Sequence, residues 1–225
     1  MIYQHQVVVG VTMESFKQFL SHYPLETFEK GQIILLGGDQ PRGVYVVESG
    51  LVKTYVISPS GEEQLITIDG RDAQVPVGYA VGVIDKSEYY YEAYDRCRLR
   101  VVPREDYDRH LQTNIESLYV RHVRMAILLV SMFERVQALE QPLAGSKVAR
   151  TLLYMSNRVG SLFGANSSKI QVKTTQQEIA NLLGISRETT NAELKKLELK
   201  KIITRSRKNY TLYTQKIKKY LGDRN

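Results

Sequence analysis

The sequence predicts an α+β fold in which an N-terminal antiparallel β-roll of the jelly-roll type is followed by one long helix and a C-terminal winged helix-turn-helix. Three observations support this class: short β-rich segments up to residue 102, a regular helical repeat of apolar residues after them, and a polar second helix near the C-terminus. The expected domains are residues 1–105 for the β-roll, 106–140 for the long helix and 141–225 for the C-terminal domain.

The positive charge is concentrated at the C-terminal end. The 225 residues include 31 Lys and Arg against 24 Asp and Glu, a net charge of +7. Residues 174–225 contain 12 basic and 5 acidic residues and account for all of it, whereas residues 1–173 contain 19 of each and are neutral. Such asymmetry is expected where one domain binds a polyanion, although a Lys-rich solvated surface is the alternative.

The cysteine count and hydropathy limit the compartment and the chemistry. Cys97 is the single cysteine, so the chain can form no internal disulfide and no cysteine-built zinc or iron-sulfur site. The N-terminus lacks the basic start and apolar run of a signal peptide, and no segment stays apolar for the roughly 20 residues of a membrane span. We therefore expect a cytoplasmic protein with no membrane partner.

The N-terminal part begins with a short helix and continues as closely spaced strands. Residues 13–23 carry Phe16, Phe19 and Leu20 at helical spacing. From Gly31 to about Val102, turn residues separate the β-rich segments QIILL, GVYVVES, LVKTYVIS, EQLITI and RLRVV. Short strands without intervening helices predict an antiparallel sandwich or barrel.

The next segment, residues 104–139, has a helical period with a coiled-coil seam. Spacings of four and three alternate along the seam, which consists of Leu111, Ile115, Leu118, His122, Met125, Leu129, Met132, Val136 and Leu139. A repeat of 3.5 residues over more than three heptads favours a homodimer, for which we assign the positions from Leu118 to Leu139; a single buried core helix is the alternative. A second apolar row that includes Val123 and Ile127 would contact the β-roll. The polar His122 is expected to set the register, or to sense pH.

A break at residues 141–145, which include Pro142, is expected to separate the domains. Val148, Leu152, Met155 and Val159 then predict another amphipathic helix, followed by a Gly/Asn/Ser-rich loop over residues 160–168.

The segment TTQQEIANLLGISRETTNAELKKLELKK, residues 174–201, predicts two helices joined by a tight turn. Thr175 and Glu178 match a capping box, so the first helix should begin at Gln176. Ile179, Leu182 and Leu183 supply its buried side and Ala180 allows a close crossing, whereas Gly184 permits a left-handed turn. Ser186 should then cap a second helix that begins at Arg187.

The second helix is polar where a DNA-recognition helix needs polar residues. Arg can bind guanine O6 and N7, Glu can accept from cytosine N4, and Thr or Asn can bind bases or phosphates. Beyond the helix, KKIITRSRKNYTLYT predicts a basic hairpin, a wing positioned on phosphates. The expected contacts with double-stranded DNA are made by Thr175, Gln176, Ser186, Arg187, Glu188, Thr189, Asn191, Lys195, Arg205, Arg207 and Lys208.

With these motifs in their order, the sequence resembles the CRP/FNR superfamily of bacterial transcription regulators; the strongest local match is TQQEIANLLGISRET. The resemblance covers nearly the whole chain and implies a β-roll like a cyclic-nucleotide-binding domain, and a homodimer on a roughly two-fold symmetric operator. It also implies contact with RNA polymerase, or its occlusion.

Within the resemblance, Arg187 and Glu188 stand where family members commonly place base-contacting residues. Ala192 stands where many members have a second base-contacting Arg, so one half-site position should be recognised differently or loosely. Thr190 and Glu193 replace usual apolar residues and should weaken the anchoring of the helix.

The sensor region departs further from the family. Relatives that bind cyclic nucleotide use a Gly-Glu pair and an Arg-Ser or Arg-Thr pair, whereas here Tyr79 follows Gly78 and no Arg adjoins Ser87. Because Lys86 is only a point charge, a buried phosphate would be poorly neutralised, and we do not expect cyclic nucleotide as the effector. Gly78, Tyr79, Tyr89 and Tyr91 are candidates to line a pocket for another small-molecule effector, although alternating tyrosines in a strand more often serve packing.

Three other hypotheses remain open at this point. A metal-dependent cupin enzyme would need clustered histidines, but His5, His22, His110 and His122 lie outside the predicted strands, so we expect no catalytic site, no metal and no cofactor. A dimeric ligand-binding or adaptor protein could use the basic tail on a non-DNA partner. Alternatively, the β-roll could be a structural platform without an effector.

Overall fold

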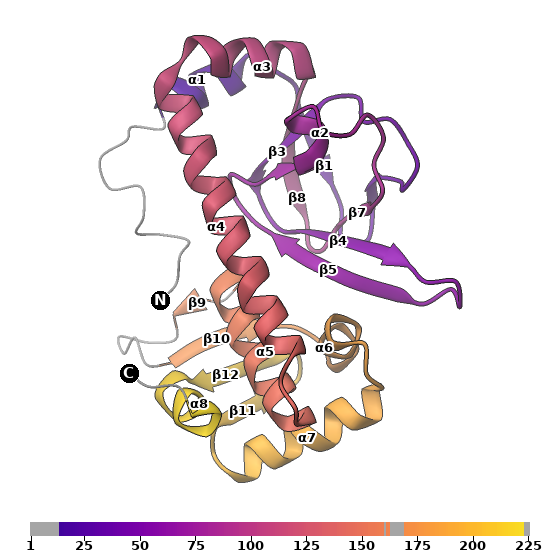
Figure 1. The fold of residues 1–225 in the computed structure, drawn as a ribbon, viewed down its shortest axis with the longest axis vertical. Coiled ribbons are helices and arrows are strands. Elements are labelled where there is room, and N and C mark those ends of the chain that lie inside the picture. Colours follow the sequence, from indigo (N-terminus) through magenta and orange to yellow (C-terminus); the bar gives the residue numbers. More distant parts are fainter. Residues whose placement is uncertain (1–13, 160, 163–168, 223–225) are drawn as a thin grey trace. The chain divides into compact units, whose positions relative to one another are not determined.

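The computed structural model describes residues 14–159, 161–162 and 169–222. Its contacts divide the chain into two compact units, and the boundary between Ile127 and Leu128 falls within the long helix, which Figure 1 labels α4 (Ile115–Leu139). Among the described residues, those up to Ile127 form the β-roll unit and those from Leu128 onward form the winged-helix unit. We describe each unit by itself. The predicted class is confirmed: an antiparallel β-domain, a long helix and a helix-turn-helix occur in the expected order.

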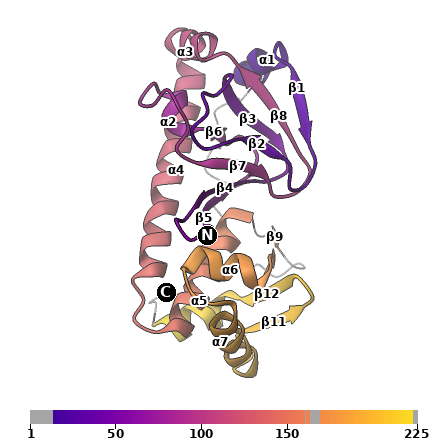
Figure 2. The same ribbon diagram turned by 90° about the vertical axis from the view of Figure 1, so that its right-hand side faces the viewer.

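The β-roll unit contains short helices and two antiparallel sheets. Its elements are α1 (Glu14–Ser21), β1 (Leu25–Phe28), β2 (Ile33–Leu35), β3 (Val44–Ser49), β4 (Val52–Ile57), β5 (Glu63–Asp69), β6 (Gln74–Val75), α2 (Val77–Ala80), β7 (Tyr90–Ala93), β8 (Cys97–Val102) and α3 (Arg104–Thr113). The strand orders are β1-β8-β3-β6 and β2-β7-β4-β5 (Figure 2). The five predicted β-rich segments all form strands, whereas β1, β6, β7 and α2 lie outside those segments.

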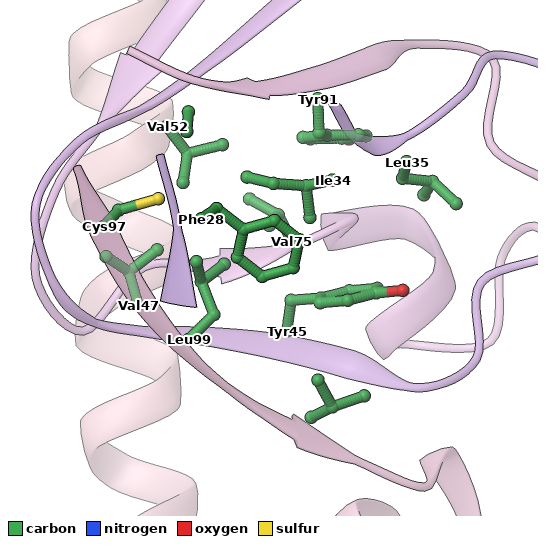
Figure 3. Packing of buried hydrophobic residues seen from close by; sticks show 12 residues of the cluster. Phe28, Ile34, Leu35, Tyr45, Val47, Val52, Val75, Tyr91, Cys97 and Leu99 are labelled. Atoms are coloured by element: carbon green, nitrogen blue, oxygen red, sulfur yellow. The ribbon is translucent and has the colours of Figure 1, made fainter. Parts of the chain in front are cut away.

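Strand β3 separates two apolar clusters, because successive side chains of a strand point to opposite faces. Tyr45 and Val47 face the cluster between the two sheets (Figure 3). Val44 and Val46 face a second cluster that includes Phe16 of α1 and residues of α2 and α3. The helices therefore cover the outer face of one sheet, and four successive residues of β3 are buried.

Cys97 and Gly50 lie where the chain packs most closely. Cys97 belongs to the inter-sheet cluster and is fully buried (Figure 3). Burial raises the pKa of its thiol to about 11, and the Asp95 carboxylate adds to the effect. Gly50 has φ +83, and a Cβ atom there would lie 2.4 Å from the carbonyl oxygen of Arg96 and 2.5 Å from the Cβ of Cys97.

The predicted single helix over residues 104–139 is two helices, α3 and α4 (Ile115–Leu139). Asn114 between them is extended, with φ −128 and ψ 99. Its Oδ1 accepts from the backbone N–H of Ser117 at 2.8 Å, and its Nδ2 donates to Ser15 Oγ at 2.7 Å. The expectation that Leu111 begins the seam is therefore wrong, because Leu111 lies on α3 and packs against the outer apolar cluster.

The first turns of α4 contact the β-roll unit through polar side chains as well as apolar ones. Arg121 is 5% exposed and donates to Gln74 Oε1 and, at 2.9 Å, to the Tyr107 hydroxyl. Arg124 binds Asp72 at 2.9 Å, and Val120 is buried beside them. The predicted apolar row with Val123 and Ile127 is only half-buried, so it does not form the main contact.

The winged-helix unit combines the end of α4 with four helices and a four-stranded sheet of order β11-β12-β10-β9. Its further elements are α5 (Ala144–Val159), β9 (Ser161–Leu162), β10 (Lys169–Lys173), α6 (Gln176–Leu183), α7 (Arg187–Leu199), β11 (Ile203–Ser206), β12 (Asn209–Tyr213) and α8 (Thr214–Leu221).

Helix α5 is central to the winged-helix unit, because α6, α7, α8 and β10 all contact it. Of its predicted apolar positions, Val148, Leu152 and Met155 are buried, and the side chain of Val159 lies outside the described part. The loop expected over residues 160–168 begins with the short strand β9, which pairs with β10. Residues 160 and 163–168 lie outside the described residues.

Candidate nucleic-acid interface

The N-terminus of α6 is fixed by a capping box, as predicted. The Thr175 hydroxyl accepts from the backbone N–H of Glu178 at 3.1 Å, and Glu178 Oε2 accepts from the backbone N–H of Thr175 at 2.7 Å. Glu178 also accepts from the Thr174 hydroxyl at 3.0 Å. Because these bonds satisfy N–H groups that the first turn leaves without helical partners, the helix begins at Gln176.

The turn between the two helices also follows the prediction. Gly184 takes the left-handed conformation with φ 63, and its N–H donates to the Ala180 carbonyl. Ser186 then caps α7, because its hydroxyl accepts from the backbone N–H of Thr189 at 3.1 Å. Helix α7 therefore begins at Arg187 and presents its first turn to solvent: Arg187, Glu188 and Thr189 are exposed.

Helix α7 is anchored by polar residues as well as by Leu194 and Leu197. Thr190 is fully buried, and its hydroxyl donates to the Ser186 carbonyl at 3.0 Å, so its polar atom is satisfied. Glu193 packs over Gly145 of α5: a Cβ atom at Gly145 would lie 2.8 Å from Glu193 Oε2. Both residues are thus accommodated at the positions where the sequence led us to expect weak anchoring.

Strands β11 and β12 form the predicted wing, and the turn between them contains Arg207 and Lys208. Arg207 has φ 55, and both side chains are exposed. The backbone N–H of Thr174 donates to the Lys208 carbonyl at 2.8 Å. This bond holds the tip of the wing beside the N-terminus of α6. Two of the predicted DNA contacts, Thr175 at that N-terminus and Lys208 in the wing, are therefore near each other.

Arg205 behaves differently from the other cations of the wing. Its side chain is 18% exposed and its Nε donates to Glu198 Oε2 at 2.6 Å. Its Nη1 donates to Asn191 Oδ1 at 3.2 Å. Because its donors are used inside the protein, Arg205 is a poor candidate for the phosphate contact that its sequence position suggested.

The charged groups of this surface are mostly available to a ligand. Among the described residues, Arg187, Lys195, Arg207 and Lys208 form no salt bridge. Arg135 of α4 is partly desolvated, which lowers its pKa, and it donates to the Leu182 carbonyl at 3.1 Å, at the end of α6. The last turns of α4 are therefore connected to the helix-turn-helix by a hydrogen bond.

The four residues proposed for an effector pocket do not come together. Tyr79 lies in the outer apolar cluster, with the Arg104 guanidinium 5.1 Å from its ring centroid. Gly78 packs against Ile84. Tyr91 belongs to the inter-sheet cluster and Tyr89 packs against it. The expectation of one shared pocket is therefore wrong, because the α2 residues face one side of a sheet and the β7 residues face the other.

Between Gly78 and Arg100 no arginine side chain lies in the apolar interior, although Arg121 of α4 is buried beside Gln74 and Tyr107. Ser87 is 1% exposed and its hydroxyl donates to the Tyr89 carbonyl at 2.7 Å, while Lys86 is exposed. On β8, Arg98 is exposed and Arg100 binds Glu48 at 2.9 Å. Burial raises the pKa of Tyr91 above its usual range, as expected for a phenol in an apolar setting.

Histidines and acidic groups do not assemble a metal site in the described part of the chain, where no three of His, Cys, Asp and Glu lie close enough to share an ion. His110 and His122 lie on α3 and α4 and His22 follows α1; His5 lies outside the described residues. Within the same residues, no helix is both long and apolar enough to cross a membrane.

Helix α4 exposes a long apolar stripe along its seam. Six of the eight seam positions on this helix are exposed: Ile115, Leu118, His122, Met125, Leu129 and Val136. Met132 and Leu139 are half-buried. Phe133, at 63% exposed, widens the stripe beside Leu129, at 56%. Large apolar side chains in one exposed row indicate a protein-protein contact surface.

A β-roll followed by a long helix and a winged helix-turn-helix defines a class of DNA-binding regulators with a separate sensor-like domain. The comparisons with known families agree with this class. Residues 25–114 match the model described as cyclic nucleotide-binding domain, and residues 146–216 match the model described as Crp-like helix-turn-helix domain. The chain belongs to the CRP/FNR family of transcription regulators, whose members bind DNA and are not enzymes.

Individual relatives are distant but cover most of the chain. The regulatory protein HlyX of Actinobacillus pleuropneumoniae is 27% identical over 82% of this chain and 75% of its own. The cAMP-activated global transcriptional regulator CRP of Escherichia coli is 23% identical over 90% of this chain and 95% of its own.

Solved structures share the fold. A mutant of CooA from Carboxydothermus hydrogenoformans has a TM-score of 0.74 at 16% identity and covers 96% of this chain and 97% of its own. FixK2 from Bradyrhizobium japonicum has a TM-score of 0.73 at 18% identity, with 90% and 98% covered.

Proposed function

We propose that the protein is a cytoplasmic, homodimeric transcription regulator that binds a roughly palindromic operator and acts on transcription by contacting or occluding RNA polymerase, without enzymatic activity. The observation that carries the proposal is the capped α7, whose first turn exposes Arg187, Glu188 and Thr189 beside a basic wing. Helix N-termini of this kind enter the major groove, where Arg and Glu discriminate between bases.

The proposed DNA contacts have two kinds. Arg187, Glu188, Thr189 and Asn191 on α7 would contact base edges. The phosphates would be held by Thr175, Gln176, Ser186, Lys195, Arg207 and Lys208. We do not assign Arg205 to a phosphate, because its guanidinium is paired with Glu198 within the protein.

The proposed dimer forms through the apolar stripe of α4, from Leu118 to Leu139. Support comes from the exposure of its apolar residues in the single chain and from their seam spacing. A second copy that contributes the same stripe would bury both surfaces and would place two recognition helices on two half-sites.

We propose further that the β-roll does not use cyclic nucleotide, and holds either a different effector or none. The sequence resemblance puts Tyr79, after Gly78, where relatives that bind cyclic nucleotide have a Glu, and the interior is filled by residues such as Tyr45 and Tyr91. Exposed Lys86 could not neutralise a buried phosphate as a bidentate Arg does.

Selection of bound sequences from a random DNA pool tests the proposal, using the purified protein at near-physiological salt without added ligand. We expect a palindromic motif, and we expect Arg187→Ala to lose specific recognition while it still dimerises. A single good base contact discriminates by about 1–3 kcal/mol, so the loss should be at least roughly fivefold per half-site.

Three results would contradict the proposal in different ways. Equal affinity of the wild type for operator and random DNA would refute sequence-specific binding. Salt-sensitive binding without sequence preference would favour the adaptor hypothesis, in which the basic tail contacts another acidic partner. A measurable shift in affinity on addition of cyclic nucleotide would refute the effector assignment.

A further inference from the structure

Four polar side chains connect the three elements that the proposed function assigns to DNA. Glu198 and Asn191 belong to α7, Arg205 to β11 and Gln176 to the N-terminus of α6. Arg205 Nε donates to Glu198 Oε2 at 2.6 Å, Arg205 Nη1 donates to Asn191 Oδ1 at 3.2 Å, and Gln176 Nε2 donates to the same Oδ1 at 3.1 Å. A single side-chain oxygen, that of Asn191, therefore receives hydrogen bonds from both flanking elements.

The orientation of the Asn191 amide follows from the chemistry of Arg205. An amide carries an acceptor oxygen and a donor nitrogen of similar shape, which neighbours must distinguish. A guanidinium has five N–H donors and no acceptor, so the atom that faces Arg205 must be the oxygen. With the oxygen directed inward, Nδ2 is the polar atom left for a ligand, and among the described residues it has no hydrogen-bond partner.

The orientation is held firmly because Arg205 is itself held. Its guanidinium forms an ion pair with Glu198, with side chains 18% and 30% exposed. Two N–H groups of the fork thus bind Glu198 and a third binds Asn191, a geometry that a lysine ammonium cannot reproduce. Arg207, two residues further along the wing, is exposed and has no such partner among the described residues.

We infer that Arg205 is a positioning residue that fixes Asn191 as a hydrogen-bond donor toward a base edge in the major groove. The inference rests on the proposed function and determines what the operator must offer: the base facing Asn191 presents an acceptor, such as guanine O6 or N7, adenine N7 or thymine O4. A freely turning Asn would also accept from the amino groups of cytosine or adenine. The wing thereby limits which bases the recognition helix accepts.

The first test compares Arg205→Lys with the control Arg109→Lys, at an exposed arginine of α3 outside the proposed DNA interface, each selected on random DNA next to the wild type. Both substitutions keep the charge. We expect Arg205→Lys to broaden the preference at one position of each half-site, with a loss of roughly fivefold or more in discrimination there, and Arg109→Lys to leave every position unchanged. An unchanged motif for Arg205→Lys, or a uniform loss of affinity for all sequences, would overturn the inference.

A second variant separates positioning from folding. Asn191→Asp keeps an acceptor for Arg205 and Gln176, so the melting temperature should not fall. Because the substitution removes the outward donor, the preferred base at the same position should change to one that offers an amino group, cytosine or adenine. Selection of the wild-type base by Asn191→Asp would refute the donor role. If the wild type itself selects no motif, the proposed function fails together with the inference. If the wild type selects a motif and both variants select the same one, the inference alone fails.

Discussion

The two units of the chain use their charged residues in opposite ways. In the β-roll unit several cations are neutralised by neighbours: Lys53 binds Glu63 at 2.8 Å and Glu92 at 3.2 Å, and Arg124 binds Asp72. In the winged-helix unit the basic excess lies at the surface, where Arg187, Arg207 and Lys208 are exposed. A net charge of +7 therefore describes only one end of the molecule, and the positive field that a polyanion meets belongs to that end.

The β-roll unit, in contrast, should respond strongly to a change at one of its closest backbone contacts, Gly50. Gly50→Ala should destabilise this unit by about 3 kcal/mol or more, because the left-handed conformation costs about 1–2 kcal/mol for a non-glycine residue and overpacking adds about 1–3 kcal/mol. Urea unfolding of the full chain measures the change.

The control for this variant is Gly61→Ala. Gly61 has φ +82, nearly the same as Gly50, but nothing lies within 4 Å of the added Cβ. It should therefore cost only the backbone strain, about 1–2 kcal/mol. Equal effects of the two variants would show that the close approach at Arg96 and Cys97 does not limit stability.

The long helix joins the two units and should respond to charge on its apolar stripe. Leu129→Glu with Met132→Glu should weaken dimerisation by about 3 kcal/mol or more, roughly a hundredfold in dissociation constant, because unpaired charges would be buried in the seam. Light scattering over a concentration series measures the mass.

Gln137→Glu is the matched control for the stripe, because this exposed position already provides an acceptor for Arg150 and lies off the seam. A dimeric double variant would refute the seam assignment. Dissociation of the Gln137→Glu control would instead point to a general effect of charge on α4.

The exposed cations of the wing should control the salt dependence of DNA binding. Removal of two phosphate contacts in Arg207→Ala with Lys208→Ala should reduce the slope of log affinity against log salt by roughly two and leave the selected motif unchanged. Lys218→Ala with Lys219→Ala, which removes the same charge from α8, serves as the control. Equal slopes for the two variants would mean that the wing tip contributes only long-range charge.

The smallest effect concerns pH. Desolvation lowers the pKa of His110. Its ring stacks on the Phe19 ring with 3.9 Å between the centroids, and its Nε2 forms a hydrogen bond with Ser117 Oγ at 2.8 Å. Because the unfolded chain binds the proton more readily, the stability from this site is complete above the unfolded pKa of about 6.5 and declines as the pH falls below it. Thermal melts between pH 7 and pH 5 should show a shallower decline for His110→Gln than for the wild type; identical slopes would exclude His110 as the cause.

The features that the sequence predicted well are those decided by neighbours in the chain. The capping box of Thr175 and Glu178, the left-handed Gly184 and the Ser186 cap each involve residues three or four apart, and each is present. The break at Asn114 was missed because apolar residues continue at helical spacing through it, while its extended backbone depends on Ser15, 99 residues away.

Long-range partners explain the other differences. Nothing in the local sequence marks Arg121 as buried, yet its guanidinium binds Gln74 and Tyr107 in the interior. Arg205 looked like a phosphate contact, yet Glu198 and Asn191 hold it. The four effector candidates were grouped by chain position, whereas the alternation of β3 and the fold of α2 separate them.

The buried position of Cys97 makes this protein convenient to label. A fully buried thiol with a pKa of about 11 presents almost no thiolate at neutral pH, so maleimides should not react with it. A cysteine introduced at an exposed site, such as Lys219→Cys, would then be the only reactive thiol without any need to remove the native one. A single fluorophore could be attached to the winged-helix unit in this way, and DNA binding and subunit exchange could be followed on the otherwise unaltered chain.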